Sequence, residues 1–441
     1  MMMDFKDYYL HSHIRKNLLN WYPFKKNSKI LEIRAENGAI TKLLKEKLNY
    51  TQEIQDSEYD YILINQFTGT YQECLNELNH LKKYLTPNGV ILLTAHNRKG
   101  LKNYAWIQNK QLKNTEHLLC QEDIKEILNT IQLPNYKILY PYPDHIFPDT
   151  IYSEDFVNTL PYKLPLTNYY ENILHLFPEQ EINTQLASLG LSGEYANSFL
   201  IEIQNNHHTI SSIQDINYIK LSAYRRKEYQ IATIIHNKET VEKIPLTKQA
   251  QNHITHMHQI PTNIGKIQYL QTYPTSGFQY KYINQESLEE KLLQSNKSEF
   301  LNIIKNFYKA LKYNSYPSTN YHTKKFRELF TNDKTSTLFN VHNPGNIDLN
   351  FANIFQIDDT YWAIDYEWSF DIEIPVEFIL WRAVFIFYLN NGFQDKVVDI
   401  SEVYRYLGIS ETDCEVFEKW NIGFSDYYTD VFVPFKEYKK R

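Results

Sequence analysis

The sequence predicts two successive domains: an α/β domain built on a largely parallel sheet, and an α+β domain with two lobes. In the first half of the chain, short apolar runs alternate with helix-compatible segments, a pattern typical of parallel strands joined by helices. In the second half, three consecutive strand-like runs are followed by mostly helical sequence. The 441 residues, with 42% hydrophobic content, are enough for each domain to bury a core of its own.

The elements of the first domain follow from the spacing of apolar residues and turn formers. The run Ser28 to Ile33 predicts a strand, and Gly38 opens the turn into a helix that ends near Leu48. The expected order is strand 28–33, helix 38–48, strand 59–64, helix 71–84, strand 90–94, helix 122–131, strand 136–140 and strand 197–203. A proline-rich and aromatic-rich insert, 141–193, separates the last two strands.

A polar, weakly patterned segment, Gln204 to Gln214, indicates the boundary between the domains. The predicted domains are therefore 1–205 and 218–441, joined by a linker at 206–217. The second domain is expected to contain strands 218–222, 229–235 and 241–245, helix 247–258, hairpin strands 353–357 and 362–364, and helix 377–389.

Charge and cysteine content exclude several classes of protein. The net charge is −6, from 46 Lys+Arg and 52 Asp+Glu, and no block of like charges marks a nucleic-acid surface. The cysteines Cys74, Cys120 and Cys414 are widely spaced, which argues against a disulfide framework or a zinc site and favours a reducing cytoplasm. No apolar run is long enough for a transmembrane helix, so any membrane association is expected to be peripheral.

Three polar residues, Asp348, Asn353 and Asp365, give the strongest functional signal in the chain. Asn353 follows Asp348 by five positions, and Asp365 comes after a short predicted hairpin. A phosphotransferase centre needs this set, because one Asp accepts the proton of the acceptor hydroxyl while an Asn and a second Asp hold a metal ion. The alternative interpretation is structural: Asp348 and Asn353 form an Asx turn, and Asp365 caps a strand.

The segment Leu31 to Thr41 (LEIRAENGAIT) resembles the first motif of class I S-adenosylmethionine-dependent methyltransferases, which have a Rossmann-like fold. The resemblance extends over about 10–205, and several further segments resemble bacterial members associated with surface-polysaccharide assembly. It implies that Glu32 and Gly38 contact the cofactor. However, Arg34 and Glu36 occupy positions where the motif has glycine.

The first domain also has too few residues between Gly38 and Tyr59 for the second strand, its helix and the third strand of the methyltransferase fold. The expected sheet is therefore a reduced one. These departures disfavour S-adenosylmethionine as a cofactor and predict a degenerate, methyltransferase-like domain.

The segment Ile364 to Trp368 (IDYEW) is similar to the metal-binding motif of aminoglycoside and choline kinases, and this resemblance covers about 218–395. It implies a bilobal, protein-kinase-like fold with Mg²⁺ and ATP as cofactors. By this resemblance Asp348 is the catalytic base, Asn353 and Asp365 are the metal ligands, and Lys243, which ends a predicted strand, contacts the phosphates.

Two features of the second domain depart from that family. The turn that contains Arg225 and Arg226 has no glycine to cover the phosphates, so these two arginines are expected to supply positive charge instead. No Asp or Glu lies between Lys243 and Gln285, so the helix 247–258 offers no carboxylate partner for Lys243.

Histidines supply weaker signals. His253 and His256 share one face of the predicted helix 247–258, which is compatible with a metal site if a third ligand lies elsewhere. His207 and His208 lie in the predicted linker and have no evident partner. Asp144 and His145, in the insert, either shape the rim of a site or contact the substrate.

The leading hypothesis is a Mg²⁺-ATP-dependent phosphotransferase that acts on a glycan or small hydroxyl acceptor in bacterial surface-polysaccharide assembly. Its expected partners are a nucleotide, a glycan or lipid-linked acceptor and, at the membrane surface, a polysaccharide assembly complex. The first domain then serves as a pseudo-methyltransferase scaffold. Two alternatives remain open: a non-catalytic pseudoenzyme that acts as an interaction scaffold, and an S-adenosylmethionine-dependent methyltransferase.

Overall fold

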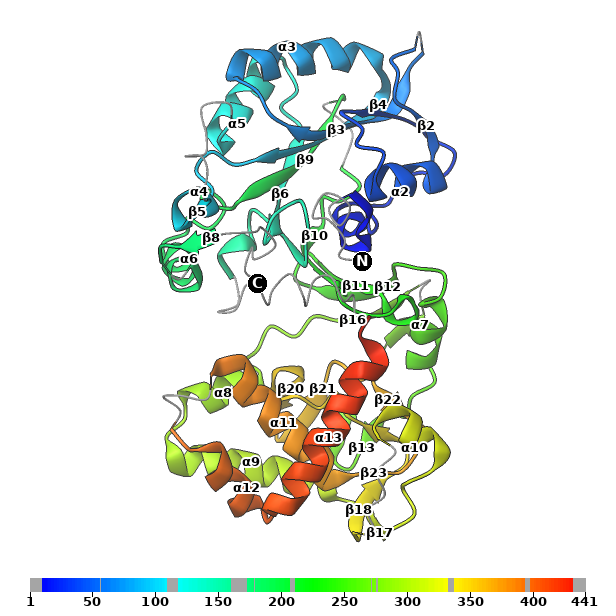
Figure 1. Ribbon diagram of the computed structural model, residues 1–441, viewed down its shortest axis with the longest axis vertical. Helices are drawn as coiled ribbons and strands as arrows, with labels where there is room; N and C mark the ends of the chain where they lie inside the picture. Colours follow the sequence, from blue (N-terminus) through cyan, green and yellow to red (C-terminus); the bar gives the residue numbers. More distant parts are fainter. Residues whose placement is uncertain are drawn as a thin grey trace. The chain divides into compact units, whose positions relative to one another are not determined.

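The computed structural model describes residues 10–55, 57–108, 118–159, 173–177, 179–206, 211–270, 272–274, 277–331, 337–392 and 397–430. The chain forms two compact units (Figure 1). Unit 1 comprises the chain up to Tyr224 together with Gln230–Lys238. Unit 2 comprises Arg225–Tyr229 and Glu239–Asp430.

Unit 1 contains the elements that the first domain was expected to have, at nearly the predicted positions. They are η1 (His13–Leu18), β1 (Lys29–Ile33), α2 (Ala39–Lys47), β2 (Asn49–Thr51), β3 (Tyr59–Phe67), α3 (Tyr71–Leu81), η2 (Lys82–Tyr84), β4 (Leu85–His96), α4 (Lys102–Ala105), β5 (Trp106–Gln108), α5 (Gln121–Thr130), β6 (Tyr136–Tyr142), β7 (Thr150–Ser153), η3 (Val157–Thr159), β8 (Ile173–His175), α6 (Glu179–Ser188), β9 (Ser198–Gln204), β10 (Ile216–Leu221) and β11 (Ile231–His236).

The main sheet of unit 1 is mixed, whereas the sequence predicts a parallel one. Its strands are hydrogen-bonded in the order β11-β10-β7-β6-β9-β4-β3-β1-β2. β2, β1, β3 and β4 are parallel, and β9 lies antiparallel between β4 and β6. This arrangement is a methyltransferase-like Rossmann fold. Among the described residues no strand lies beyond β2, which agrees with the reduced sheet that the short interval after Gly38 predicts.

The core of unit 1 forms where amphipathic helices cover this sheet. On α3, the buried residues Cys74, Leu78 and Leu81 recur at helical spacing, and the capping box of Thr70 and Glu73 fixes the start of the helix. These residues belong to one hydrophobic cluster with apolar side chains of α5 and of strands β3, β4 and β9. The packing of α3 and α5 therefore supports the strands that neighbour β1, and the loop with Arg34, Glu36 and Gly38 follows β1.

The strands β10 and β11 belong to unit 1 rather than opening unit 2. The sequence places the start of the second domain at residue 218, within β10. β10 pairs with β7 through Tyr218 and Lys220 as well as with β11, so it continues the sheet of unit 1. Part of the predicted linker, residues 207–210 with His207 and His208, lies outside the described residues.

Unit 2 combines small sheets with a helical part. Its elements are η4 (Lys227–Tyr229), β12 (Thr240–Pro245), α7 (Gln251–Met257), β13 (Asn263–Ile264), β14 (Ile267–Tyr269), β15 (Thr272–Pro274), β16 (Phe278–Lys281), α8 (Leu288–Gln294), α9 (Lys297–Lys312), β17 (Tyr316–Ser318), α10 (Lys324–Leu329), β18 (Phe339–His342), β19 (Gly345–Asn346), η5 (Phe351–Asn353), β20 (Ile354–Ile357), β21 (Thr360–Ala363), β22 (Ser369–Phe370), β23 (Ile374–Pro375), α11 (Val376–Asn391), α12 (Ile400–Leu407) and α13 (Glu411–Tyr428).

The hairpin between Asn353 and Asp365 is confirmed as β20 and β21, which pair antiparallel. Its two turn residues, Asp358 and Asp359, both have positive φ, as a tight hairpin turn of the primed type requires. The buried helix predicted at 377–389 is confirmed as α11, whose apolar residues point to several sides because neighbouring elements cover it. The hairpin begins after the loop that carries Asp348 and ends just before Asp365. Helix α11 follows the segment that carries Asp365.

Helix α13 packs so closely on unit 2 that Gly423 has no room for a side chain. A methyl group there would overlap the carbonyl group of Phe330. We expect Gly423→Ala to lower the stability of unit 2 by about 2 kcal/mol or more, because the two backbones must separate. The matched control is Ile422→Ala on the exposed side of the same helix, which should change stability by less than about 0.5 kcal/mol. Equal melting temperatures for the two variants would contradict the tight contact.

Candidate functional site

The predicted site residues of unit 2 come together around Lys243. This lysine lies on β12, and its side chain is buried. Its Nζ donates a hydrogen bond to Asp365 Oδ1 at 2.7 Å and lies 3.9 Å from Glu367 Oε2. Burial disfavours the charged ammonium, but Asp365 and Glu367 outweigh it and raise the pKa of Lys243 above its ordinary value. The carboxylate partner missing from helix α7 is thus supplied by the loop after β21.

Three carboxylates form an acidic group at this centre. Asp348, Asp365 and Glu367 each place one oxygen within 4.8 Å of the others. Asp348 and Glu367 are buried, and Asp365 is half-buried. Carboxylate oxygens are the ligands that hard divalent cations prefer, so the chemistry of this group suits such an ion.

Glu367 is the site residue that sequence reasoning missed. It belongs to the segment 364–368 that carries the kinase resemblance, yet only Asp365 of that segment was assigned a role. Arg225 Nη2 donates to Glu367 Oε1 at 2.5 Å, and His253 Nε2 lies 3.4 Å from Glu367 Oε2. Burial opposes its ionisation, but Arg225 and Lys243 hold the pKa of the Glu367 carboxyl well below its ordinary value. The available signal was that Glu367 lies two positions after Asp365 in the same motif.

Asp348 is oriented by the backbone around it. Its backbone N–H donates to Asn346 Oδ1 at 2.7 Å, and its Oδ2 accepts from the backbone N–H of Trp368 at 3.2 Å. Asn346 therefore anchors this loop two positions before Asp348. Burial raises the pKa of Asp348 well above its ordinary value, and the charges of Asp365 and Glu367 raise it further. Such a carboxyl has a strong tendency to take up a proton.

Asn353 orders the loop that carries Asp348. Its Nδ2 donates to the carbonyl oxygen of Asp348 at 3.0 Å, and its carbonyl oxygen accepts from the backbone N–H of Ile364 at 3.0 Å. Asn353 thereby joins the loop before the hairpin to the strand end after it. The three-carboxylate group of the described residues adds Glu367 to Asp348 and Asp365, and the role of Asn353 as a metal ligand remains a prediction.

Arg225 and Arg226, expected to contact phosphates, both have protein partners. Arg225 pairs with Glu367, as described above. Arg226 donates from Nη2 to the carbonyl oxygen of Asp426 at 2.8 Å and from Nε to that of Thr429 at 3.2 Å. The turn that contains Arg225 and Arg226 is therefore held by Glu367 and by the end of helix α13.

The histidines on α7 do not share one metal site. His253 lies beside Glu367, with its ring 4.9 Å from that of Trp368. His256 Nε2 contacts the carbonyl oxygen of Ser369 at 2.8 Å. Within the described residues, neither histidine belongs to a group of three ligands, so the metal-site interpretation of this helix face has no support.

In unit 1, polar residues of the loop expected to hold a cofactor have hydrogen-bond partners within the protein. Glu32 is buried at the end of β1 and accepts hydrogen bonds from Thr41 Oγ1 at 2.8 Å and Tyr50 OH at 2.7 Å. Burial raises the pKa of this carboxyl. A side chain at Gly38 would overlap the carbonyl of Leu10, so glycine is needed there for a close approach of two backbones.

The two residues that replace glycine in this loop are also engaged. Arg34 donates to both carboxylate oxygens of Glu77, at 2.8 and 2.7 Å. Glu36 accepts from Arg15 at 2.7 Å. These ion pairs give the non-glycine residues structural roles.

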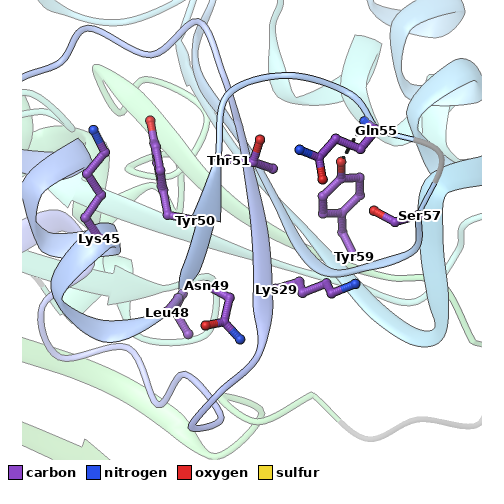
Figure 2. Close-up of a pocket in the computed structure, with 9 residues that line it drawn as sticks. All are labelled: Lys29, Lys45, Leu48, Asn49, Tyr50, Thr51, Gln55, Ser57 and Tyr59. Carbon is purple, nitrogen blue, oxygen red and sulfur yellow. Dashed lines mark hydrogen bonds between the residues drawn. The ribbon is translucent and has the colours of Figure 1, made fainter.

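Unit 1 has a cavity of about 600 Å³ beside the edge strand β2. Figure 2 shows the side chains that line it. The side chains of Lys45 and Tyr50 line one part of it, and Lys45 Nζ lies 4.9 Å from the centre of the Tyr50 ring. Tyr59 lines another part, where its hydroxyl accepts from the backbone N–H of Gln55 at 2.9 Å. The cavity adjoins the position where a further strand would pair with β2.

Asp144 and His145 lie inside unit 1 rather than on a rim. Both are buried, and Asp144 Oδ2 accepts from Lys102 Nζ at 2.8 Å. Burial lowers the pKa of His145 to about 3, so its ring is neutral at physiological pH. The residues therefore form part of a buried polar cluster.

No family model and no curated protein match this chain. Among solved structures, the plantazolicin methyltransferase BpumL in complex with SAH matches at 15% identity and a TM-score of 0.25, covering 44% of this chain and 83% of that one. A SAM-dependent methyltransferase from Archaeoglobus fulgidus matches at 15% identity and a TM-score of 0.29, covering 43% and 92%. One from Thermotoga maritima matches at 10% identity and a TM-score of 0.24, covering 44% and 90%.

These comparisons correct the expectation about cofactors. The sequence favours Mg²⁺ and ATP and disfavours S-adenosylmethionine, whereas the solved structures found are SAM-dependent methyltransferases and one of them holds SAH. The expectation was wrong because it relied on two residues, Arg34 and Glu36, that replace glycine in the loop after β1, and gave less importance to the α/β fold of the domain. The kinase-like assignment of unit 2 remains a prediction.

None of the helices in the described ranges combines the length and apolar character needed to cross a bilayer.

Asp348→Asn tests the electrostatics of the acidic centre. An acid whose pKa is raised in the folded chain lowers stability as the pH rises above its unfolded pKa of about 4. We therefore expect Asp348→Asn to raise the melting temperature at pH 7.5 by about 2–4 °C and to lose this advantage near pH 4. The control is Asp371→Asn, which removes an exposed carboxylate of unit 2. A lower melting temperature than wild type at pH 7.5 would show that the Asp348 charge is stabilising.

Proposed function

We propose that unit 2 is a kinase-like phosphotransferase centre that transfers a phosphoryl group from a nucleotide to a hydroxyl group of a glycan or small acceptor. One observation carries this proposal: Lys243, which is far from Asp348 and Asp365 in the sequence, meets these two acids at one centre, where its Nζ lies 2.7 Å from Asp365 Oδ1. The kinase resemblance of the segment 364–368 agrees with this arrangement.

Each residue has a distinct role in this proposal. Phosphoryl transfer depends chiefly on positioning and on neutralising the charge of the phosphates. Lys243 supplies a buried positive charge for the phosphates, and the oxygens of Asp365 and Glu367 hold a divalent cation. Asp348, whose pKa is raised by burial, accepts the proton of the acceptor hydroxyl.

The biological setting is proposed from the resemblance alone. A methyltransferase-like domain fused to a kinase-like domain resembles bacterial enzymes that modify or terminate surface polysaccharides. A glycan or lipid-linked acceptor and a peripheral assembly complex are the partners that this setting favours. Unit 1 then serves as the scaffold on which the acceptor is presented.

The phosphotransferase proposal predicts a loss of transfer when Asp348 is changed. A panel of terminally labelled nucleoside triphosphates is offered with divalent cations and acceptor glycans, and transfer of label is measured. We expect Asp348→Asn to lower kcat by about 10²-fold or more, because the proton acceptor is lost. Asp371→Asn, the exposed control, should transfer as fast as wild type. Equal rates for Asp348→Asn and wild type would reject the role of Asp348.

A second candidate, methyl transfer by unit 1, is favoured by the strand order β2-β1-β3-β4-β9-β6 and by the acid Glu32 at the end of β1. It predicts that S-adenosylmethionine binds with measurable heat in calorimetry and that Glu32→Gln weakens binding about tenfold, the loss expected from one charged hydrogen bond. Glu46→Gln, an exposed change on α2, is the control. Absence of binding to wild type would reject methyl transfer, and absence of both activities would favour a scaffold.

A further inference from the structure

The short segment Arg225–Tyr229 is fastened to the end of helix α13 within unit 2. The backbone N–H of Arg226 donates to the carbonyl oxygen of Tyr428 at 2.8 Å, and its side chain bonds the carbonyls of Asp426 and Thr429. The last carbonyls of a helix lack partners within the helix, and a cation there also complements the helix dipole. Arg226 therefore acts as a cap on α13.

Two further contacts hold the same segment on the same helix end. The hydroxyl groups of Tyr229 and Tyr427 are hydrogen-bonded at 2.6 Å, and their ring centres lie 5.6 Å apart. Arg225 forms an isolated β-bridge with Thr429. The attachment thus involves backbone, guanidinium and aromatic groups, all of them outside the acidic centre.

This attachment directs Arg225 into the acidic centre. Its Nη2 lies 2.5 Å from Glu367 Oε1, and its guanidinium carbon lies 5.3 Å from the Trp368 ring centre and 6.0 Å from that of Tyr428. Glu367 is only 4% exposed, so its charge requires a nearby cation. The guanidinium meets this requirement without any bound ion.

We propose that the last turn of α13 is a latch that holds Arg225 on Glu367, so that the guanidinium competes with a divalent cation for the acidic centre. Release of the turn frees one carboxylate for the cation and two arginines for an anionic ligand. The closed contact is therefore autoinhibitory. The autoinhibitory role of the latch rests on the proposed phosphotransferase function. The competition between the Arg225 guanidinium and a divalent cation does not depend on that function.

The latch is tested with Mn²⁺ alone as the probe. The double variant Arg226→Ala/Tyr427→Phe removes the side-chain bonds of the attachment to α13, and it leaves the backbone contacts as well as Asp348, Asp365 and Glu367 in place. We expect its Mn²⁺ affinity, measured by calorimetry, to rise about tenfold, within the range usual for coupled sites. Amide hydrogen exchange in 225–229 should become faster. Arg405→Ala on the exposed side of α12 is the matched control and should change neither quantity.

Faster exchange with unchanged Mn²⁺ affinity would overturn the latch, and so would unchanged exchange. If the double variant does not fold, Arg225→Gln tests the competition directly, because it removes the guanidinium charge. Its Mn²⁺ affinity must rise, and an equal or lower affinity would also overturn the proposal.

The same variants separate the latch from the proposed function. Higher Mn²⁺ affinity without phosphoryl transfer in any variant would support the latch and reject the phosphotransferase. Transfer by the wild type together with unchanged Mn²⁺ affinity in the released variants would reject the latch and leave the phosphotransferase intact. Faster transfer in the released variants supports both.

Discussion

The ion pair of Lys243 with Asp365 is the interaction on which the architecture of unit 2 depends. A buried ammonium group is strongly unfavourable unless carboxylates surround it, so β12 and the loop after β21 must meet. Once they do, Glu367 is also buried and requires a cation of its own, which Arg225 supplies. One charge requirement thus explains why two distant parts of the chain converge, and why Arg225–Tyr229 groups with unit 2.

Local elements were predictable because they depend on neighbouring residues. Alternation and helical spacing gave β3, α3 and α11 at nearly their observed positions. The proximity of Asn353 to the strand end near Asp365 was also predictable, because a short hairpin must bring its two ends together. The α/β organisation of unit 1 followed from the order of its strands and helices along the chain, whereas its likeness to methyltransferases came from the resemblance of the segment 31–41.

Long-range partners were not predictable from the same patterns. Lys243 and Asp365 are separated by 122 positions, and Arg225 and Glu367 by 142. Nothing in the spacing of charges shows which acid pairs with which base at such a distance, so the ion pair of Arg225 with Glu367 could not be predicted. The position of β10 in the sheet of unit 1 was missed for a similar reason. β10 pairs with β7, and a polar segment separates these two strands in the sequence.

Within the described residues β2 is the last strand at its edge of the sheet, which has a consequence for how unit 1 behaves at high concentration. An exposed sheet edge invites another chain to add a strand, and the risk grows with the length and flatness of the edge. β2 has only three residues, and Lys29 and Lys45 line the adjoining cavity. A partner strand would find few backbone groups to bond and two positive charges to accommodate. The reduced sheet therefore ends in an edge that discourages self-association.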